Sequence, residues 1–98
     1  MLVAHTGTEQ WTDYVVKNLN NYKSFDLALS STTNQQIVGL LHIPKCIMEN
    51  ATNGESAILV GSSINYDMGI KGQIYKKTEN TIAVYGLVNY ILQLYGEK

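Results

Sequence analysis

The chain contains no arginine, one cysteine, one proline and no long hydrophobic run. Arginine is the usual bidentate reader of phosphate and guanine, and seven lysines are offset by eight acidic residues, so we expect no nucleic-acid partner. Cys46 stands alone, so it cannot form an intramolecular disulfide, which suits a reducing cytoplasmic location. No segment approaches the roughly 18 apolar residues that a membrane-spanning helix needs, so we expect no membrane span.

Residues that carry catalysis or bind metals are few and scattered along the chain. His5 and His42 are far apart and only one cysteine accompanies them, whereas a zinc site needs several ligands at recognisable spacing. Cys46 follows His42 by four residues, but no third group orients the pair. The carboxylates lie mostly in polar loops, and the glycines form no phosphate-binding motif. We therefore predict no enzyme, no metal site and no cofactor, with a thiol or hydrolytic enzyme based on Cys46 as a minor alternative.

The two ends of the chain show patterns that predict helices. Thr6-Gly7-Thr8-Glu9 fits a capping box. Trp11, Val15 and Leu19 follow it at steps of four residues, which is typical of one face of a helix. A second set of apolar residues recurs at three- and four-residue steps near the end of the chain: Leu87, Tyr90, Ile91, Leu94 and Tyr95.

Between these segments the sequence predicts an antiparallel sheet. Apolar or alternating β-prone runs are separated by turn-forming residues. The expected strands cover 25–29, 37–41, 57–61, a weaker 64–68, 72–77 and 81–85, with a short helix over 45–49. Sequential strands with helices at the ends indicate a single α+β domain over 1–98, in which N- and C-terminal helices flank the sheet.

Three segments resemble the profilin family. Trp11-Thr12-Asp13-Tyr14-Val15 looks like the start of the profilin N-terminal helix. Gly72–Thr78 followed by Thr81–Gly86 is similar to the late hairpin of that family, and 87–93 looks like a clipped version of its last helix. The chain is shorter than a typical profilin, and a strand position that is commonly tryptophan in the family falls near 36–38, which is not aromatic.

The resemblance implies a monomeric cytoplasmic protein of the cytoskeleton that binds actin or an actin homologue and regulates its polymerisation. Lys77 matches a lysine of the actin-binding surface, and Lys71 is a looser match. Many profilins also bind phosphoinositides, although few basic residues remain here for that role. Profilins further bind polyproline in a groove between the terminal helices. In this chain the residues that would line the groove are Trp11, Tyr14, Tyr90 and Tyr95.

A second class of protein fits the expected fold as well. Roadblock and longin scaffolds combine an antiparallel sheet with flanking helices, and they dimerise or bind to a partner protein. A profilin-like chain would be a monomer, so the oligomeric state separates the two hypotheses. The aromatic residues also have an alternative interpretation, as a packed seam between the terminal helices.

Overall fold

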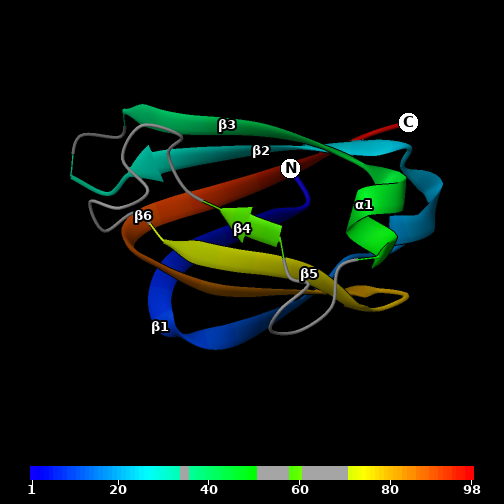
Figure 1. Cartoon of the computed structure of the whole chain (residues 1–98), viewed down its shortest axis with the longest axis horizontal. Helices are drawn as coiled ribbons and strands as arrows, with labels where there is room; N and C mark the ends of the chain where they lie inside the picture. Colours follow the sequence, from blue (N-terminus) through cyan, green and yellow to red (C-terminus); the bar gives the residue numbers. More distant parts are fainter. Residues whose placement is uncertain (34–35, 51–57, 61–70) are drawn as a thin grey trace.

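Strands form most of the molecule in the computed structural model of the chain (Figure 1). The structure describes residues 1–33, 36–50, 58–60 and 71–98. Its elements are β1 (Val3–Val15), the 3-10 helix η1 (Leu19–Asn21), β2 (Ser24–Ser31), β3 (Ile37–Pro44), α1 (Lys45–Asn50), β4 (Ile58–Val60), β5 (Gly72–Thr78) and β6 (Thr81–Glu97).

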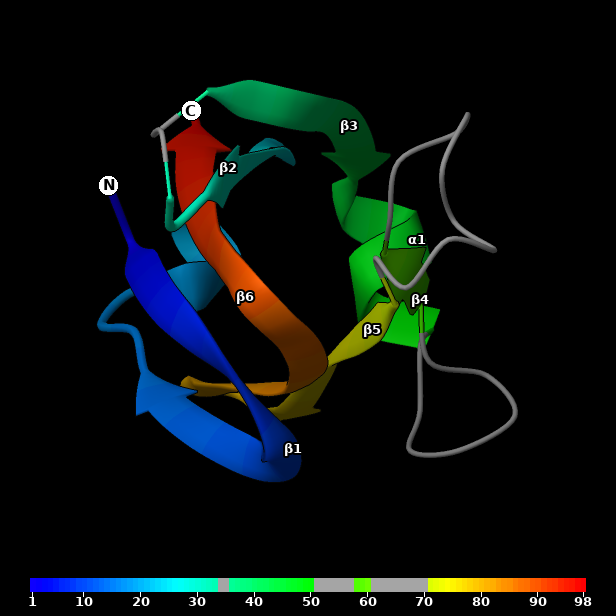
Figure 2. The same ribbon diagram turned by 90° about the vertical axis from the view of Figure 1, so that its left-hand side faces the viewer.

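Strand β6 is the centre of the sheet. Its first half pairs with β5 and its second half with β2, while β1 pairs with both halves. The strand order is β3-β2-β6-β5-β4, with β1 also on β6, and every pairing is antiparallel. Figure 2 shows β1 and β6 bending together, so that the sheet folds back on itself and forms two layers.

The bend in β6 depends on unusual backbone conformations. Gly86, Leu87 and Asn89 have φ angles of 84°, 66° and 72°, in the left-handed region that glycine adopts most easily. Opposite them, the register of β1 shifts on both sides of Thr8. Gly7 passes so close to the bend that a Cβ atom there would lie 1.7 Å from the Leu87 carbonyl oxygen. Only glycine fits at this crossing.

The core lies between the two layers. Aliphatic side chains and Phe25 fill it, and helix α1 contributes Met48 at one end of the sheet (Figure 1). Burying a large apolar side chain contributes about 1.5–3 kcal/mol, so this cluster is the main source of stability. Within this cluster, the side chains that are at most 2% exposed are Leu19, Phe25, Leu27, Leu29, Ile43, Met48, Ile74, Ile82, Val84, Leu87, Leu92 and Leu94.

One polar side chain, His5, is fully buried among the described residues. Its Nε2 lies 3.2 Å from the Gly86 carbonyl oxygen, and its Nδ1 lies 2.7 Å from the Tyr14 hydroxyl. A carbonyl only accepts, so Nε2–H donates to Gly86 and Nδ1 accepts from Tyr14. Burial lowers the pKa of His5 and raises that of Tyr14. The neutral imidazole thus ties β1 to the bend of β6.

The predicted fold class is wrong at both ends of the chain, because the expected N- and C-terminal helices are strands β1 and β6. A spacing of four residues also keeps side chains on one face of a strand, whose faces repeat every two residues. The last segment is rich in β-branched and aromatic residues, which favour strands. Thr6–Glu9, read as a capping box, lies instead where β1 bends over β6.

The predictions for the middle of the chain agree better with the structure. The hairpin of 25–29 with 37–41 is β2–β3, and the hairpin of 72–77 with 81–85 is β5–β6. The short helix over 45–49 is α1, and β4 falls within the run 57–61. The weaker candidate, 64–68, lies outside the described residues. Of the helices that the structure describes, none is long and apolar enough to cross a membrane.

Candidate functional sites

Three aromatic side chains form an exposed cluster, the aromatic surface, on the outer side of β1, β6 and β5. Trp11 of β1 lies opposite Tyr85 of β6. Tyr75 of β5 lies opposite Ala83, which is two residues before Tyr85 on β6 and therefore on the same face of the sheet. The ring of Trp11 stands edge-on to Tyr75 (centroids 5.2 Å apart, 84°) and is tilted against Tyr85 (5.4 Å, 43°). These arrangements are the favourable ones for aromatic pairs.

The aromatic surface remains open to solvent although its rings touch. Trp11 is 36% exposed and Tyr85 is 37% exposed, whereas Tyr75 is half-buried. Ala83 is buried beneath this face, and its small side chain leaves room for the rings to lean together. Beside Tyr85 is an open hollow of about 260 Å³, lined also by Lys71, Gly72 and Gln73. A ligand could therefore contact flat aromatic faces and enter the adjoining depression.

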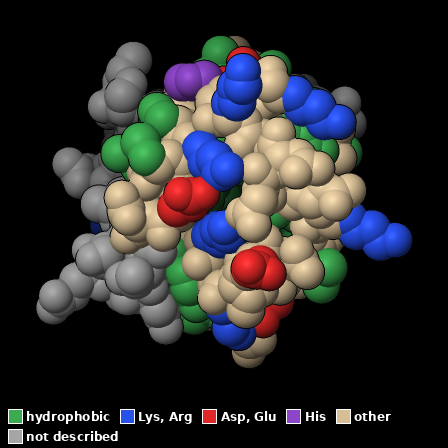
Figure 3. Space-filling model, turned by 90° about the vertical axis from the view of Figure 1, so that its right-hand side faces the viewer, with side chains coloured by type: hydrophobic (Ala, Val, Ile, Leu, Met, Phe, Trp, Pro, Cys, Tyr) green, Lys and Arg blue, Asp and Glu red, His purple; other side chains and the backbone are tan. Residues whose placement is uncertain are grey.

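Both lysines of the predicted actin-binding surface flank the aromatic surface. Lys71 lines the hollow beside Tyr85. Lys77 forms an ion pair with Asp13, with its Nζ 2.8 Å from Oδ2, and the hydrogen bond to Asp13 raises the pKa of Lys77. Around the end of the molecule that carries α1 and η1, lysine and acidic side chains are interspersed (Figure 3). The described surface there does not gather charge of one sign.

The structure does not bring the four predicted polyproline residues together. Tyr14 points inward to His5, and Tyr90 packs against the core. Tyr95 is 41% exposed on β6, in the layer that β2 and β3 share. A groove between terminal helices is not formed, because both segments are strands. Trp11 has Tyr75 and Tyr85 as its aromatic neighbours instead.

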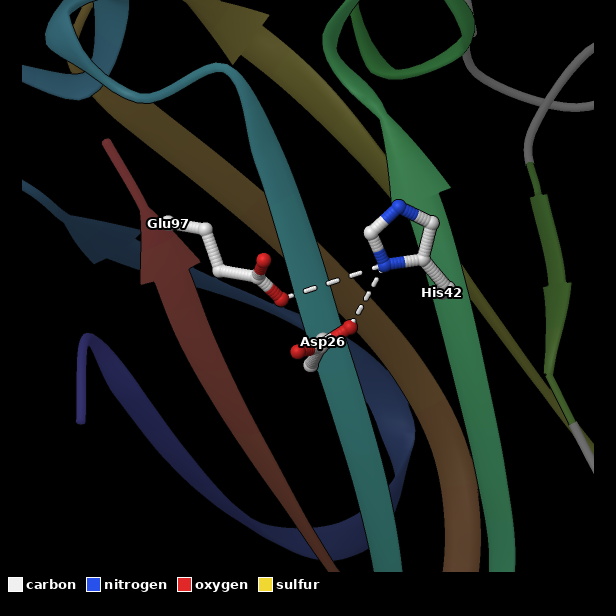
Figure 4. Close-up of side chains that lie close together, drawn as sticks. All are labelled: Asp26, His42 and Glu97. Atoms are coloured by element: carbon white, nitrogen blue, oxygen red, sulfur yellow. Dashed lines mark hydrogen bonds and ion pairs between the residues drawn. The ribbon is translucent and has the colours of Figure 1, made fainter.

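A polar cluster, Asp26–His42–Glu97, lies on the β2–β3 layer and brings together side chains from three strands (Figure 4). Asp26 and His42 are directly opposite each other in the β2–β3 pair, and Glu97 comes from β6 on the other side of β2. His42 Nδ1 is 2.7 Å from Asp26 Oδ1 and 3.9 Å from Glu97 Oε1. All three side chains are about half exposed, at 50%, 57% and 49% for Asp26, His42 and Glu97.

Hydrogen bonds within this cluster shift the pKa values of all three side chains. A hydrogen bond with Glu97, and then one with His42, lowers the pKa of Asp26. The same contact with Asp26 raises the pKa of Glu97, and the hydrogen bond to Asp26 raises the pKa of His42. The opposite directions of these shifts make Asp26 the more acidic of the two carboxyl groups.

Sequence reasoning missed the polar cluster for a topological reason. The predicted hairpin of 25–29 with 37–41 includes Asp26 but ends one residue before His42. Glu97 is far along the chain and follows a segment that was predicted to be a helix. Only the pairing of β6 with β2 places it beside Asp26.

Comparison with protein-family models, with curated proteins and with solved structures gives no match for this chain. The resemblance to profilins, and the actin binding that it implies, stays a prediction. The same holds for the roadblock- or longin-like scaffold. The geometry of the two sites therefore carries the functional argument.

Proposed function

We propose that this protein is a peptide-binding module that holds a proline-rich segment of a partner protein on the aromatic surface. The observation that carries the proposal is that Trp11 packs against both Tyr75 and Tyr85, while Trp11 and Tyr85 stay more than one third exposed. Aromatic side chains contribute a large contact area at a small entropic cost, which is why they dominate binding hot spots.

A polyproline II helix suits such a surface because it is already extended before it binds. It has three residues per turn and no internal hydrogen bonds, so its proline rings pack on aromatic faces while its carbonyls remain free. The indole N–H of Trp11 and the hydroxyls of Tyr75 and Tyr85 are hydrogen-bond donors. On this surface they are the groups that would donate to the peptide carbonyls.

The charges around the aromatic surface favour a peptide over a nucleic acid. Proteins that stack bases on aromatic side chains combine them with a positively charged groove that follows the phosphates. Here Lys77 is paired with Asp13, and the chain has no arginine. Lys71 is the cation that lines the hollow beside Tyr85. A weakly charged, proline-rich segment matches the charges around the aromatic surface better than a polyanion does.

Tryptophan fluorescence tests the proposal directly, because Trp11 is the only indole. Titration with a proline-rich peptide should shift the emission and saturate, whereas a glycine–serine peptide of the same length should not. Tyr85→Ala and Tyr75→Ala should each weaken binding about tenfold or more, as expected for hot-spot tyrosines. Tyr95→Ala is the matched control, since Tyr95 is equally exposed on the other layer.

Two results would count against the peptide site. One is an unchanged emission spectrum with folded protein and excess proline-rich peptide. The other is an equal loss of binding in Tyr95→Ala and Tyr85→Ala, because the peptide would then bind elsewhere or without specificity. A saturable response to an oligosaccharide and none to the peptide would assign the surface to a different class of ligand.

The predicted cytoplasmic location is part of the proposal, and the exposed free thiol of Cys46 supports it. Actin or an actin homologue remains a predicted partner, with Lys77 and Lys71 as the predicted contacts. A polymerisation assay with actin from the protein's own source separates the two roles. Inhibition of nucleation that Lys77→Glu abolishes would support actin binding, and unchanged nucleation with excess protein would contradict it.

A further inference from the structure

We propose that Asp26, His42 and Glu97 form a binding site for a divalent transition-metal ion, with zinc as the ion to test. The three side chains come from β2, β3 and β6 and point toward one another (Figure 4). The site lies on the layer opposite to the aromatic surface. It is therefore independent of the proposed peptide binding.

The donor set favours zinc and its neighbours over magnesium or calcium. One imidazole nitrogen and two carboxylate oxygens are ligands that zinc accepts, and three protein ligands with one open position are common in its reactive sites. Calcium takes six to eight oxygen ligands, and magnesium prefers an octahedral shell of oxygens. Imidazole suits zinc, copper, nickel and iron, so the histidine shifts the preference toward this group.

The distances are close to those that a metal would impose. The three donor atoms lie within 4.8 Å of one another. Ligands around a tetrahedral zinc ion are separated by about 3.3 Å, given bonds of about 2.0–2.1 Å. The 2.7 Å contact of His42 Nδ1 with Asp26 and its 3.9 Å contact with Glu97 therefore each need to change by about 0.6 Å. Half-exposed side chains can make this change by rotation.

The sheet holds the three residues in place before any metal binds. Asp26 pairs directly with His42, and Ser24, two residues before Asp26 on the same face of β2, pairs with Glu97. The backbone positions are thus fixed by hydrogen bonds between neighbouring strands. The ring of His42 turns Nδ1 toward both carboxylates and Nε2 away from them (Figure 4).

An open hollow of about 310 Å³ adjoins the cluster and gives the metal room for a further ligand. Asp26 and His42 line one part of it, and Leu27, Leu40 and Leu41 line the rest. The fourth coordination position can therefore hold water or a donor group from a bound molecule. An apolar wall beside a metal is typical of a site that takes an external ligand.

Calorimetric titration of the full chain with zinc chloride tests the site. The titration should be done in a Cys46→Ser background, because the exposed thiol of Cys46 can bind zinc by itself. We expect one zinc ion per chain and a higher melting temperature, since the ion would join three strands. His42→Gln, Asp26→Asn and Glu97→Gln should each weaken binding about tenfold or more.

Glu79→Gln is the matched control for Glu97→Gln, since Glu79 is an exposed carboxylate in the turn between β5 and β6. It should leave zinc affinity unchanged, and circular dichroism will show that each variant is folded. Cobalt should replace zinc and give the visible absorption of a low-coordinate nitrogen and oxygen site. The proposal is overturned by no stoichiometric binding, by equal affinity in His42→Gln, or by displacement of zinc with equimolar magnesium.

Discussion

Replacing Gly7 with alanine perturbs the closest backbone approach in the fold, where β1 crosses the bend of β6. The added Cβ would lie 1.7 Å from the carbonyl oxygen of Leu87, 2.1 Å from its carbonyl carbon and 2.7 Å from the Val88 nitrogen. All three are backbone atoms, so no side-chain rotation relieves the overlap. Reaching an ordinary contact requires β1 and β6 to separate by about 1.5 Å or more at this point.

The cost of that separation has two parts. Overpacking a close-packed interior costs about 1–3 kcal/mol, and more when the backbone must move. The shift would also pull His5 from the Gly86 carbonyl oxygen, 3.2 Å away, and an unsatisfied buried polar group costs about 1–3 kcal/mol. We therefore expect Gly7→Ala to lose about 3–5 kcal/mol out of a total stability of about 5–15 kcal/mol. For a domain of this size, that lowers the melting temperature by about 12 °C or more.

Thermal and urea unfolding followed by far-ultraviolet circular dichroism measure this loss. Gly96→Ala is the matched control, because its Cβ would meet the ring of Tyr22, 2.4 Å away. That ring belongs to a partly exposed side chain and can rotate, so this variant should lose only about 1 kcal/mol. A melting temperature for Gly7→Ala within a few degrees of the wild type, or equal to that of Gly96→Ala, would refute the reasoning.

Two further predictions concern His5. Burial lowers the pKa of His5 below its usual 6.5, so the unfolded chain binds the proton more tightly, and the free energy of unfolding should fall as the pH drops through 6.5. Urea titrations between pH 5 and 8 measure this pH dependence. They should be done in a His42→Gln background, because the raised pKa of His42 contributes in the opposite direction. A free energy of unfolding that rises toward pH 5 would contradict the prediction. Tyr14→Phe removes the hydroxyl that donates to Nδ1 and should cost about 1–2 kcal/mol at pH 7.5, also by urea unfolding. An unchanged midpoint there would mean that water replaces the hydroxyl.

The middle of the fold was predictable because its signals are local. Alternating runs with polar turns between them identify the β2–β3 and β5–β6 hairpins, and Pro44 marks the start of α1. The ends were not predictable in the same way. Trp11 and Val15 satisfy a helical spacing and a strand spacing equally, and the choice depends on whether β6 is available as a pairing partner.

The candidate sites likewise combine residues that were noticeable in the sequence with residues that only strand pairing brings together. Trp11 stood out as the one tryptophan, but its partners are Tyr75 and Tyr85, which only the register of β5 and β6 brings next to it. The three residues of the proposed metal site did not stand out in the sequence, because Asp26 and Glu97 are separated by most of the chain. Spacing along the chain identifies ligands on one helix or loop, but not ligands on paired strands.

Local patterns in the sequence were enough to predict the two hairpins and the short helix, and composition gave the lone thiol and the weak net charge. These follow from residue type and nearest neighbours, which act over a few residues. The tertiary structure alone decided that both ends are strands, that Gly7 meets Leu87 at the crossing, and that His5 is buried against Gly86. It also brought together both proposed sites. The physical reason is that β pairing is a long-range interaction, whose partner is fixed by the register of the whole sheet.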